Sequence, residues 1–123
     1  MSGVVVVVDK EKDVLGHSPS PGDDDRQQFR ELRVDAAQRR AWLGGRTIRL
    51  TPLEFRLLHE LMRQQGRVQT RQRLLAEVWE LSPSEATLQT VDTHVKRLRK
   101  KLGSAAAYIE TVRGVGYRFS DVL

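Results

Sequence analysis

The hydrophobic pattern is clearest over Leu88–Leu102. Its apolar residues Val91, Val95, Leu98 and Leu102 recur at steps of four, three and four, which places them on one stripe of an α-helix. The positions opposite this stripe are polar or cationic, namely Gln89, Thr93, Lys96, Arg97 and Lys100. The pattern predicts a helix that packs by one face and presents a basic face, which is either solvated or binds a polyanion.

A second pattern follows directly, over Tyr108–Phe119. β-Branched and aromatic residues flank Arg113–Gly116, which predicts two short strands joined by a tight turn. Two arginines, Arg113 and Arg118, lie in or beside this turn. A basic helix followed at once by a basic hairpin is the order of a winged helix–turn–helix. In that fold the helix enters the DNA major groove and the hairpin, or wing, lies along the backbone or minor groove.

Two further helices are predicted ahead of this pair. Thr51–Glu54 forms a capping box with proline at the first helical position, and Gly66 ends that helix. Its inward residues are Phe55, Leu58, Leu61 and Met62. Thr70 begins the next helix, in which Arg71 opposes the helix dipole unless a phosphate lies nearby or solvent screens it. The inward residues of that helix are Leu74, Leu75, Val78 and Trp79.

The connection Glu80–Thr87 is longer than a minimal turn between two such helices. Ser82–Glu85 has the pattern of a capping box, so the basic helix begins there or after a kink near Thr87. At its other end, Gly103 ends the basic helix.

Short strands are predicted in the N-terminal half. The three candidates are Phe29–Val34, Ala41–Leu43 and Thr47–Leu50, and Gly44-Gly45 between the last two is a two-residue hairpin signal. We expect these strands to form a small antiparallel sheet that packs on the first helix, with Trp42 in the core. Val68 indicates a further short strand that could pair with the wing.

Residues 1–28 have a different composition and are expected to form a leader and linker, partly disordered or adding a strand, ahead of a folded domain at 29–121. Val4–Val8 is a run of valines that should be ordered only if it pairs with the N-terminal sheet or another copy of the chain. His17–Asp25 is a linker by composition, and its three aspartates are interpreted as a solvated spacer.

Composition supports an intracellular protein that binds a polyanion. The chain of 123 residues fits one domain, contains no cysteine, and shows neither a membrane-length apolar run nor a signal peptide, so we expect it in the cytoplasm and not at a membrane. Residues 1–35 carry eight acids and five bases, for a net −3, whereas residues 36–123 carry eight acids and sixteen bases, for +8. The basic excess therefore belongs to the folded part, which favours nucleic acid.

No motif in the chain predicts catalysis. The sequence contains no Gly-rich phosphate loop, no HExxH and no Gly-x-Ser-x-Gly, and its three histidines suggest no triad. His59, inside a predicted helix without a second ligand at helical spacing, is interpreted as structural. We therefore expect no enzyme activity, no cofactor and no metal site.

The segments TVDTHVKRLRKKL and YIETVRGVGYRF closely resemble the DNA-binding (effector) domain of the OmpR/PhoB family of bacterial response regulators. LTPLEFRLLHEL at Leu50–Leu61 and TRQRLLAEVW at Thr70–Trp79 also match, so that the resemblance covers roughly Phe29 to Phe119. It implies an α+β winged helix–turn–helix with an N-terminal antiparallel sheet, a three-helix core and a C-terminal β-hairpin wing.

The resemblance also implies a function. The expected protein binds double-stranded promoter DNA and regulates transcription as the effector of a two-component response regulator. Its copies form a homodimer head to tail on direct repeats, controlled by a sensor kinase that phosphorylates a receiver domain. The sequence does not contain that receiver, so it is either an excised effector domain or a stand-alone regulator. In the family, the loop Glu80–Glu85 is associated with RNA polymerase; its residues are Glu80, Leu81, Ser82, Pro83, Ser84 and Glu85.

Individual residues carry the expected DNA contacts. The helix face opposite the apolar stripe offers four base-reading candidates: Thr93, Lys96, Arg97 and Lys100. Arg97 is the first choice, because a guanidinium can bind guanine O6 and N7 with two parallel hydrogen bonds, while the methyl of Thr93 can meet a thymine methyl. The expected phosphate contacts, for several of which local capping or hairpin pairing is the alternative, are Thr90, His94, Arg99, Thr111, Tyr117 and Arg71.

Two further positions complete this set. Arg113 matches the wing arginine that enters the minor groove. Gln89 departs from the family, since many relatives have arginine there, and a phosphate contact is lost with it.

The alternative function is a winged-helix interaction module whose basic face docks an acidic protein partner.

Overall fold

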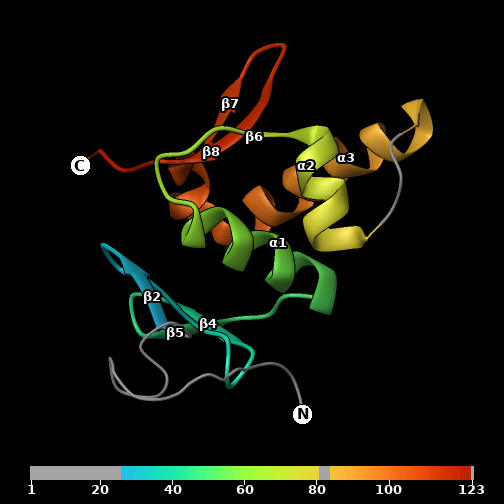
Figure 1. The fold of residues 1–123 in the computed structure, drawn as a ribbon. Coiled ribbons are helices and arrows are strands. Elements are labelled where there is room, and N and C mark those ends of the chain that lie inside the picture. The colour runs from blue at the N-terminus through green and yellow to red at the C-terminus, as the bar shows by residue number, and fades with distance from the viewer. Residues whose placement is uncertain (1–25, 81–83, 123) are drawn as a thin grey trace, which may run out of the picture.

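The computed structural model describes residues 26–80 and 84–122, so the expected strand at Val4–Val8 and the linker His17–Asp25 lie outside the described residues. In Figure 1 helix α1 lies between an N-terminal sheet and a C-terminal hairpin, with α2 and α3 beside it. The elements run in the order β2 (Arg26–Phe29), β3 (Leu32–Asp35), β4 (Arg40–Leu43), β5 (Arg46–Ile48), α1 (Pro52–Arg63), β6 (Gln69–Thr70), α2 (Arg71–Leu74), a π-helical turn η1 (Leu75–Trp79), α3 (Glu85–Leu102), a 3₁₀ turn η2 (Gly103–Tyr108), β7 (Ile109–Val112) and β8 (Gly116–Phe119).

The N-terminal sheet is antiparallel, in the order β2-β3-β4-β5. Gly44 and Gly45 form the predicted two-residue hairpin, and their φ angles of 58° and 84° are the left-handed pair that such a turn requires. The predicted single strand Phe29–Val34 is wrong, because the chain turns at Arg30 and pairs Phe29 with Leu32. Arg30 adopts a φ of 55°, which a non-glycine residue rarely does, so the sequence showed no turn there.

Trp42 does not lie in the core, contrary to the prediction. Successive side chains of a strand point to opposite faces, and the neighbouring Ala41 is buried against α1's side of the sheet. Trp42 therefore lies on the outer face, half-buried, beside its cross-strand partner Arg33. The Arg33 guanidinium carbon stands 4.7 Å from the centre of the indole ring, a cation–π contact.

Helix α1 begins at the predicted capping box. The Thr51 hydroxyl accepts from the Glu54 N–H at 3.1 Å, and the Glu54 carboxylate accepts from the Thr51 N–H at 2.8 Å. Lys101, at the end of α3, donates to the same carboxylate oxygen at 2.6 Å. The start of α1 and the end of α3 are therefore joined through one buried carboxylate.

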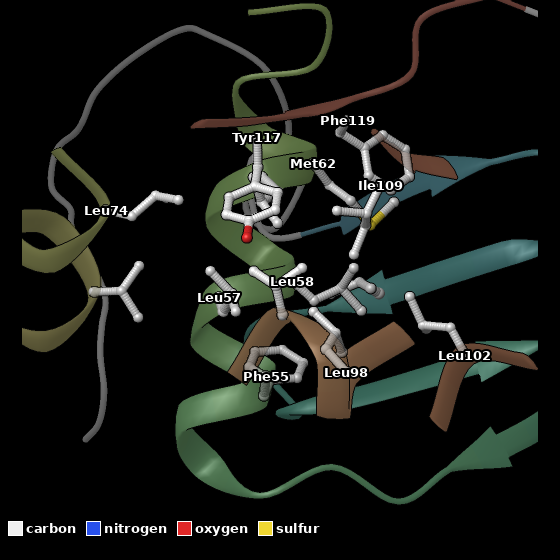
Figure 2. Packing of buried hydrophobic residues seen from close by; sticks show 14 of the residues in the cluster. Phe55, Leu57, Leu58, Met62, Leu74, Leu98, Leu102, Ile109, Tyr117 and Phe119 are labelled. Carbon is white, nitrogen blue, oxygen red and sulfur yellow. The ribbon is translucent and has the colours of Figure 1, made fainter. Parts of the chain in front are cut away.

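Helix α1 also forms the centre of the core. Its residues Leu57, Leu58 and Leu61 are completely buried, which stabilises the fold by about 1.5–3 kcal/mol for each side chain. Figure 2 shows Leu57 and Leu58 in the same cluster as residues from the other elements, including Leu98 of α3 and Phe119 of β8. One cluster thus holds α3, the wing and the N-terminal sheet on a common support.

The wing pairs with a short strand that precedes α2, as predicted. The second sheet has the order β6-β8-β7, and the short strand at Gln69–Thr70 lies one residue beyond the expected Val68. Gly116 of β8 faces Thr70 in this sheet, and a Cβ atom at Gly116 would overlap the backbone carbonyl of Gln69. Glycine is therefore required at residue 116 by packing inside the protein.

Helix α3 begins at Glu85 with Ser84 as its N-cap, so the predicted cap at Ser82 is wrong. The Ser84 hydroxyl accepts from the Thr87 N–H at 3.2 Å, and the Thr87 hydroxyl accepts from the Ser84 N–H at 2.7 Å. Threonine thus replaces the glutamate of the usual capping box. The helix ends at Leu102, where Gly103 has a φ of 58°, as the glycine predicted.

Candidate nucleic-acid interface

The basic face of α3 is fixed by the apolar face behind it. Val91, Val95, Leu98 and Leu102 are 0–1% exposed, which confirms the predicted stripe. Because α3 is anchored along this line, its opposite face is held in one orientation. The residues on that face are all exposed, and they are Gln89, Thr93, Lys96, Arg97 and Lys100.

Asp92 joins α3 to two other elements. One of its carboxylate oxygens, Oδ1, accepts from Arg71 Nε of α2 at 2.8 Å and from the Tyr117 hydroxyl of β8 at 2.6 Å. Partial burial opposes ionisation of Asp92, but the hydrogen bonds from Tyr117 and Arg71 outweigh it and hold its pKa below the usual value. The contact also raises the pKa of Arg71. Burial, followed by the contact with Asp92, raises the pKa of Tyr117 to about 12.

Arg99 joins α3 to the wing. Its Nε donates to the carbonyl oxygen of Ile109 at 3.1 Å, and its Nη2 donates to the Thr111 hydroxyl at 2.8 Å. The same guanidinium lies 5.7 Å from the ring centre of Tyr117. Two of the expected phosphate contacts, Arg99 and Thr111, are therefore in contact with each other.

His94 of α3 contacts its own helix and Trp79 of the turn η1. Its Nδ1 lies 2.9 Å from the carbonyl oxygen of Thr90, one helical turn earlier. Its ring meets the edge of Trp79 at a centroid distance of 5.3 Å. His94 and Thr90 are both partly buried, and their contact lies within α3.

The wing turn carries Arg113 in an exposed position. The Val115 N–H donates to the carbonyl of Val112 at 2.9 Å and closes the turn, and Gly114 adopts a φ of 79°. Val115 is 44% exposed, which is unusual for a large apolar side chain. Arg113 and Val115 thus form an exposed pair of side chains at the tip of the hairpin.

The loop between η1 and α3 is described only at its ends. Glu80 leaves η1 in a left-handed conformation with a φ of 59°, and its carboxylate lies 3.5 Å from Arg56 Nη2 of α1. Leu81, Ser82 and Pro83 lie outside the described residues, Ser84 caps α3, and Glu85 is its first residue.

The described residues contain no cluster of three or more His, Cys, Asp or Glu side chains that could hold a metal ion. Within the same residues, no helix combines the length and the apolar character needed to cross a bilayer.

The comparison with known families decides what kind of domain this is. Residues 45–119 match the family model described as "Transcriptional regulatory protein, C terminal". The chain belongs to this family. The transcriptional regulatory protein ResD of Bacillus subtilis is 44% identical over 95 residues, which cover 74% of this chain and 39% of ResD. The chain therefore spans well under half the length of this curated relative.

Solved structures agree with this family of C-terminal regulatory domains. The DNA-binding domain of RstA from Klebsiella pneumoniae, in complex with the RstA box, aligns with a TM-score of 0.71 and 33% identity. The alignment covers 77% of this chain and 96% of RstA's. The response regulator DrrB of Thermotoga maritima, an OmpR/PhoB homolog, aligns with a TM-score of 0.69 and 36% identity over 78% of this chain and 44% of DrrB's. The predicted OmpR/PhoB resemblance and winged-helix fold class are confirmed.

The sequence correctly predicted which residues of α3 are exposed, but it missed Asp92. No role for Asp92 was predicted, although it is the one acid among the five cations of Leu88–Leu102, and its partners Arg71 and Tyr117 were each predicted separately as phosphate contacts. The available signal was an acidic residue placed in a helix that must approach a polyanion. Such a residue is unfavourable unless cations or hydroxyl donors contact it.

Proposed function

We propose that this domain binds double-stranded promoter DNA with sequence specificity and thereby regulates transcription. One observation carries the proposal: the polar and cationic face of α3 is exposed along a helix whose other face is completely buried. A rigid helix with one buried apolar face and one exposed cationic face fits the width of the major groove. RstA, which is similar over most of this chain, is bound to its DNA box through a DNA-binding domain, and this supports the proposal.

The roles of the residues follow from the chemistry of DNA. Base edges are assigned to Thr93, Lys96, Arg97 and Lys100, and the minor groove to Arg113. Phosphates are assigned to Thr90, His94, Arg99, Thr111, Tyr117 and Arg71. Tyr117 carries a single hydroxyl hydrogen, which it donates to Asp92, so a donated bond to phosphate requires that contact to break.

The wider partners are also part of the proposal. As the effector of a two-component response regulator in the cytoplasm, the domain would bind head to tail as a homodimer on direct repeats. A receiver domain, phosphorylated by a sensor kinase, would control this assembly. RNA polymerase would meet the loop Glu80–Glu85. The names of ResD and DrrB, a transcriptional regulatory protein and a response regulator, support this reading.

The alternative, an acidic protein partner on the same face, is not favoured by the family or by the DNA-bound relative. Titration of duplex DNA at several salt concentrations separates the two. DNA binding predicts that log K falls linearly with log salt, with a slope of about −0.9 for each phosphate neutralised. An absence of DNA binding at low salt would contradict the proposal.

Selection of bound sequences from a random duplex pool then tests specificity. We expect an enriched motif and, if copies bind head to tail, two motifs in the same direction at a fixed spacing. Recovery of unenriched sequences would leave only non-specific binding.

A further inference from the structure

Asp92 occupies an unfavourable place for an acid. It is the only acidic residue in Leu88–Leu102, which carries five cations. If α3 enters a DNA groove, a carboxylate on it repels the phosphates. A carboxylate so placed must therefore contribute something that offsets this repulsion.

The contacts of Asp92 show what it contributes. Its Oδ1 is reached from α2 by Arg71 and from the wing by Tyr117, so one atom connects α2, α3 and β8. The Asp92 and Arg71 side chains are 41% and 36% exposed, which leaves the pair accessible to a ligand at the surface. Tyr117 is buried and its ring belongs to the core cluster, as Figure 2 shows, so it supplies a fixed anchor for Asp92.

The geometry of Arg71 is the decisive detail. It binds Asp92 through Nε, one of the five N–H donors of a guanidinium. A guanidinium held at Nε keeps its terminal NH₂ groups in a fixed plane, and those groups match the oxygens of a phosphate. Without Asp92, Arg71 would lose this restraint and would have to be ordered when DNA binds, at a cost in entropy.

On the basis of the proposed DNA-binding function, we propose that Asp92 is a positioning residue that orients Arg71 toward the DNA backbone. The acid increases the affinity for specific DNA, although its charge alone would decrease it. In this arrangement the Tyr117 hydroxyl hydrogen stays with Asp92 and is not donated to a phosphate. Tyr117 thereby holds the carboxylate in place, so that the wing and α3 approach the DNA as one unit.

Asp92→Asn tests the sign of the effect. The variant keeps the size of the side chain and an acceptor for Tyr117, but it removes the negative charge that binds Arg71. The probes are the duplex that the wild-type chain selects from a random pool and a random-sequence duplex of equal length. Positioning predicts about tenfold weaker binding to the selected duplex, the size expected for a hydrogen bond to a charged group. It also predicts a salt slope that is less steep by up to about 0.9, because one phosphate contact is lost.

Asp35→Asn is the matched control, since it makes the same change at a carboxylate that lies 3.8 Å from an arginine, Arg26, on the N-terminal sheet. We expect this variant to bind the selected duplex at least as tightly as the wild-type chain, with an unchanged slope. Asp92→Asn with unchanged or tighter binding would overturn the proposal, because simple electrostatics would then explain the result.

A double-mutant cycle shows whether Asp92 acts through Arg71. Arg71→Gln should itself reduce the salt slope by about 0.9, and Asp92→Asn should cause no further loss in that background. Additive losses, or an unchanged slope for Arg71→Gln, would overturn the proposal. If Asp92→Asn does not fold, which circular dichroism would show, Asp92→Glu takes its place in the cycle, because it keeps the charge but displaces the carboxylate from Arg71 Nε by one methylene. Absence of wild-type binding to any duplex would overturn the proposed function as well, whereas wild-type binding with a failed cycle overturns the positioning role alone.

Discussion

Arg97 lies on the exposed face of α3 between two residues, Val95 and Leu98, that are buried in the core. It is therefore fixed at its backbone and can extend its guanidinium into a groove. We expect Arg97→Ala to reduce the affinity for a selected duplex by about 1–3 kcal/mol and to relax preference at one base pair, with a smaller effect on random DNA.

Arg46→Ala on β5 is the control for Arg97, because it removes the same charge from an exposed position on the N-terminal sheet. Fluorescence anisotropy with selected and random duplexes would measure both variants. Equal losses on the two duplexes would show that Arg97 contacts phosphate and reads no base.

Gly116 shows that a glycine in the wing is required by packing inside the protein. A Cβ atom at residue 116 would collide with backbone atoms of Gln69 and Thr70, which cannot move without separating β6 from β8. We expect Gly116→Ala to lower the free energy of unfolding by about 1–3 kcal/mol or more, as overpacking does. Urea denaturation measures this.

The neighbouring Gly114 provides the comparison. It has open space around the added Cβ and a φ of 79°, so Gly114→Ala meets only the strain of the left-handed conformation, about 1–2 kcal/mol. If Gly114→Ala lowered the free energy of unfolding more than Gly116→Ala, the explanation that contact with β6 requires glycine at residue 116 would be wrong.

At the scale of single elements, the sequence predicted the structure correctly where neighbouring residues themselves set the backbone geometry. The side chains of Thr51 and Glu54 form the predicted capping box. Gly44 and Gly45, which have no side chain, adopt the positive φ angles of the predicted hairpin turn. The turn at Arg30 was missed because no glycine, asparagine or proline marks it. The N-cap of α3 was misplaced because threonine at residue 87 forms a capping box that the glutamate pattern does not describe.

The wing is the element in which shape recognition is expected. Arg113 stands exposed at the tip of a hairpin that β6 and Arg99 hold in place. A narrow A·T-rich minor groove attracts arginine, which is less strongly hydrated than lysine. We predict that Arg113→Ala weakens binding most on sites with an A·T-rich flank and that Arg113→Lys recovers only part of the loss.

Matched duplexes that differ only in the flank would measure this effect for the wild-type chain and both variants. A loss that does not depend on the flank would indicate a general phosphate contact. No loss at all would indicate that Arg113 remains solvated.

At the scale of the whole molecule, the contacts that organise the site join residues far apart in sequence. Asp92 meets Arg71 and Tyr117 across 21 and 25 residues, and Lys101 meets Glu54 across 47. Periodicity identifies the buried and exposed faces of each helix, but it does not determine which polar side chains meet once the faces have packed. The exposed face of α3 was therefore predictable, whereas the links between α2, α3 and the wing were not.

The global stability should depend on pH through Glu54. Burial opposes its ionisation, but Lys101 and the Thr51 N–H outweigh burial and lower its pKa. A carboxyl with a lowered pKa stabilises the fold above its unfolded value, about 4.3, and loses that contribution as the pH falls through the folded value. We expect Glu54→Gln to cost about 1–3 kcal/mol at pH 7 and to flatten the decline in stability below about pH 4.5.

Urea unfolding of wild type and Glu54→Gln between pH 7 and pH 3 measures this difference. Asp92, whose pKa is also lowered, should leave the variant with part of the acid dependence. Parallel stability curves for the two proteins would contradict the role given to Glu54.

The base of the wing is also in contact with the start of the described chain. Phe29 of β2 packs edge-on against Tyr108 and Phe119, at centroid distances of 4.9 and 5.3 Å, and the Tyr108 hydroxyl donates to Glu31 at 2.9 Å. A mechanical load applied to the chain ahead of β2 would therefore reach the base of the wing without passing through α1, α2 or α3. Fraying of β2 would release the same aromatic contacts, so amide exchange at β2 and at β8 should rise together.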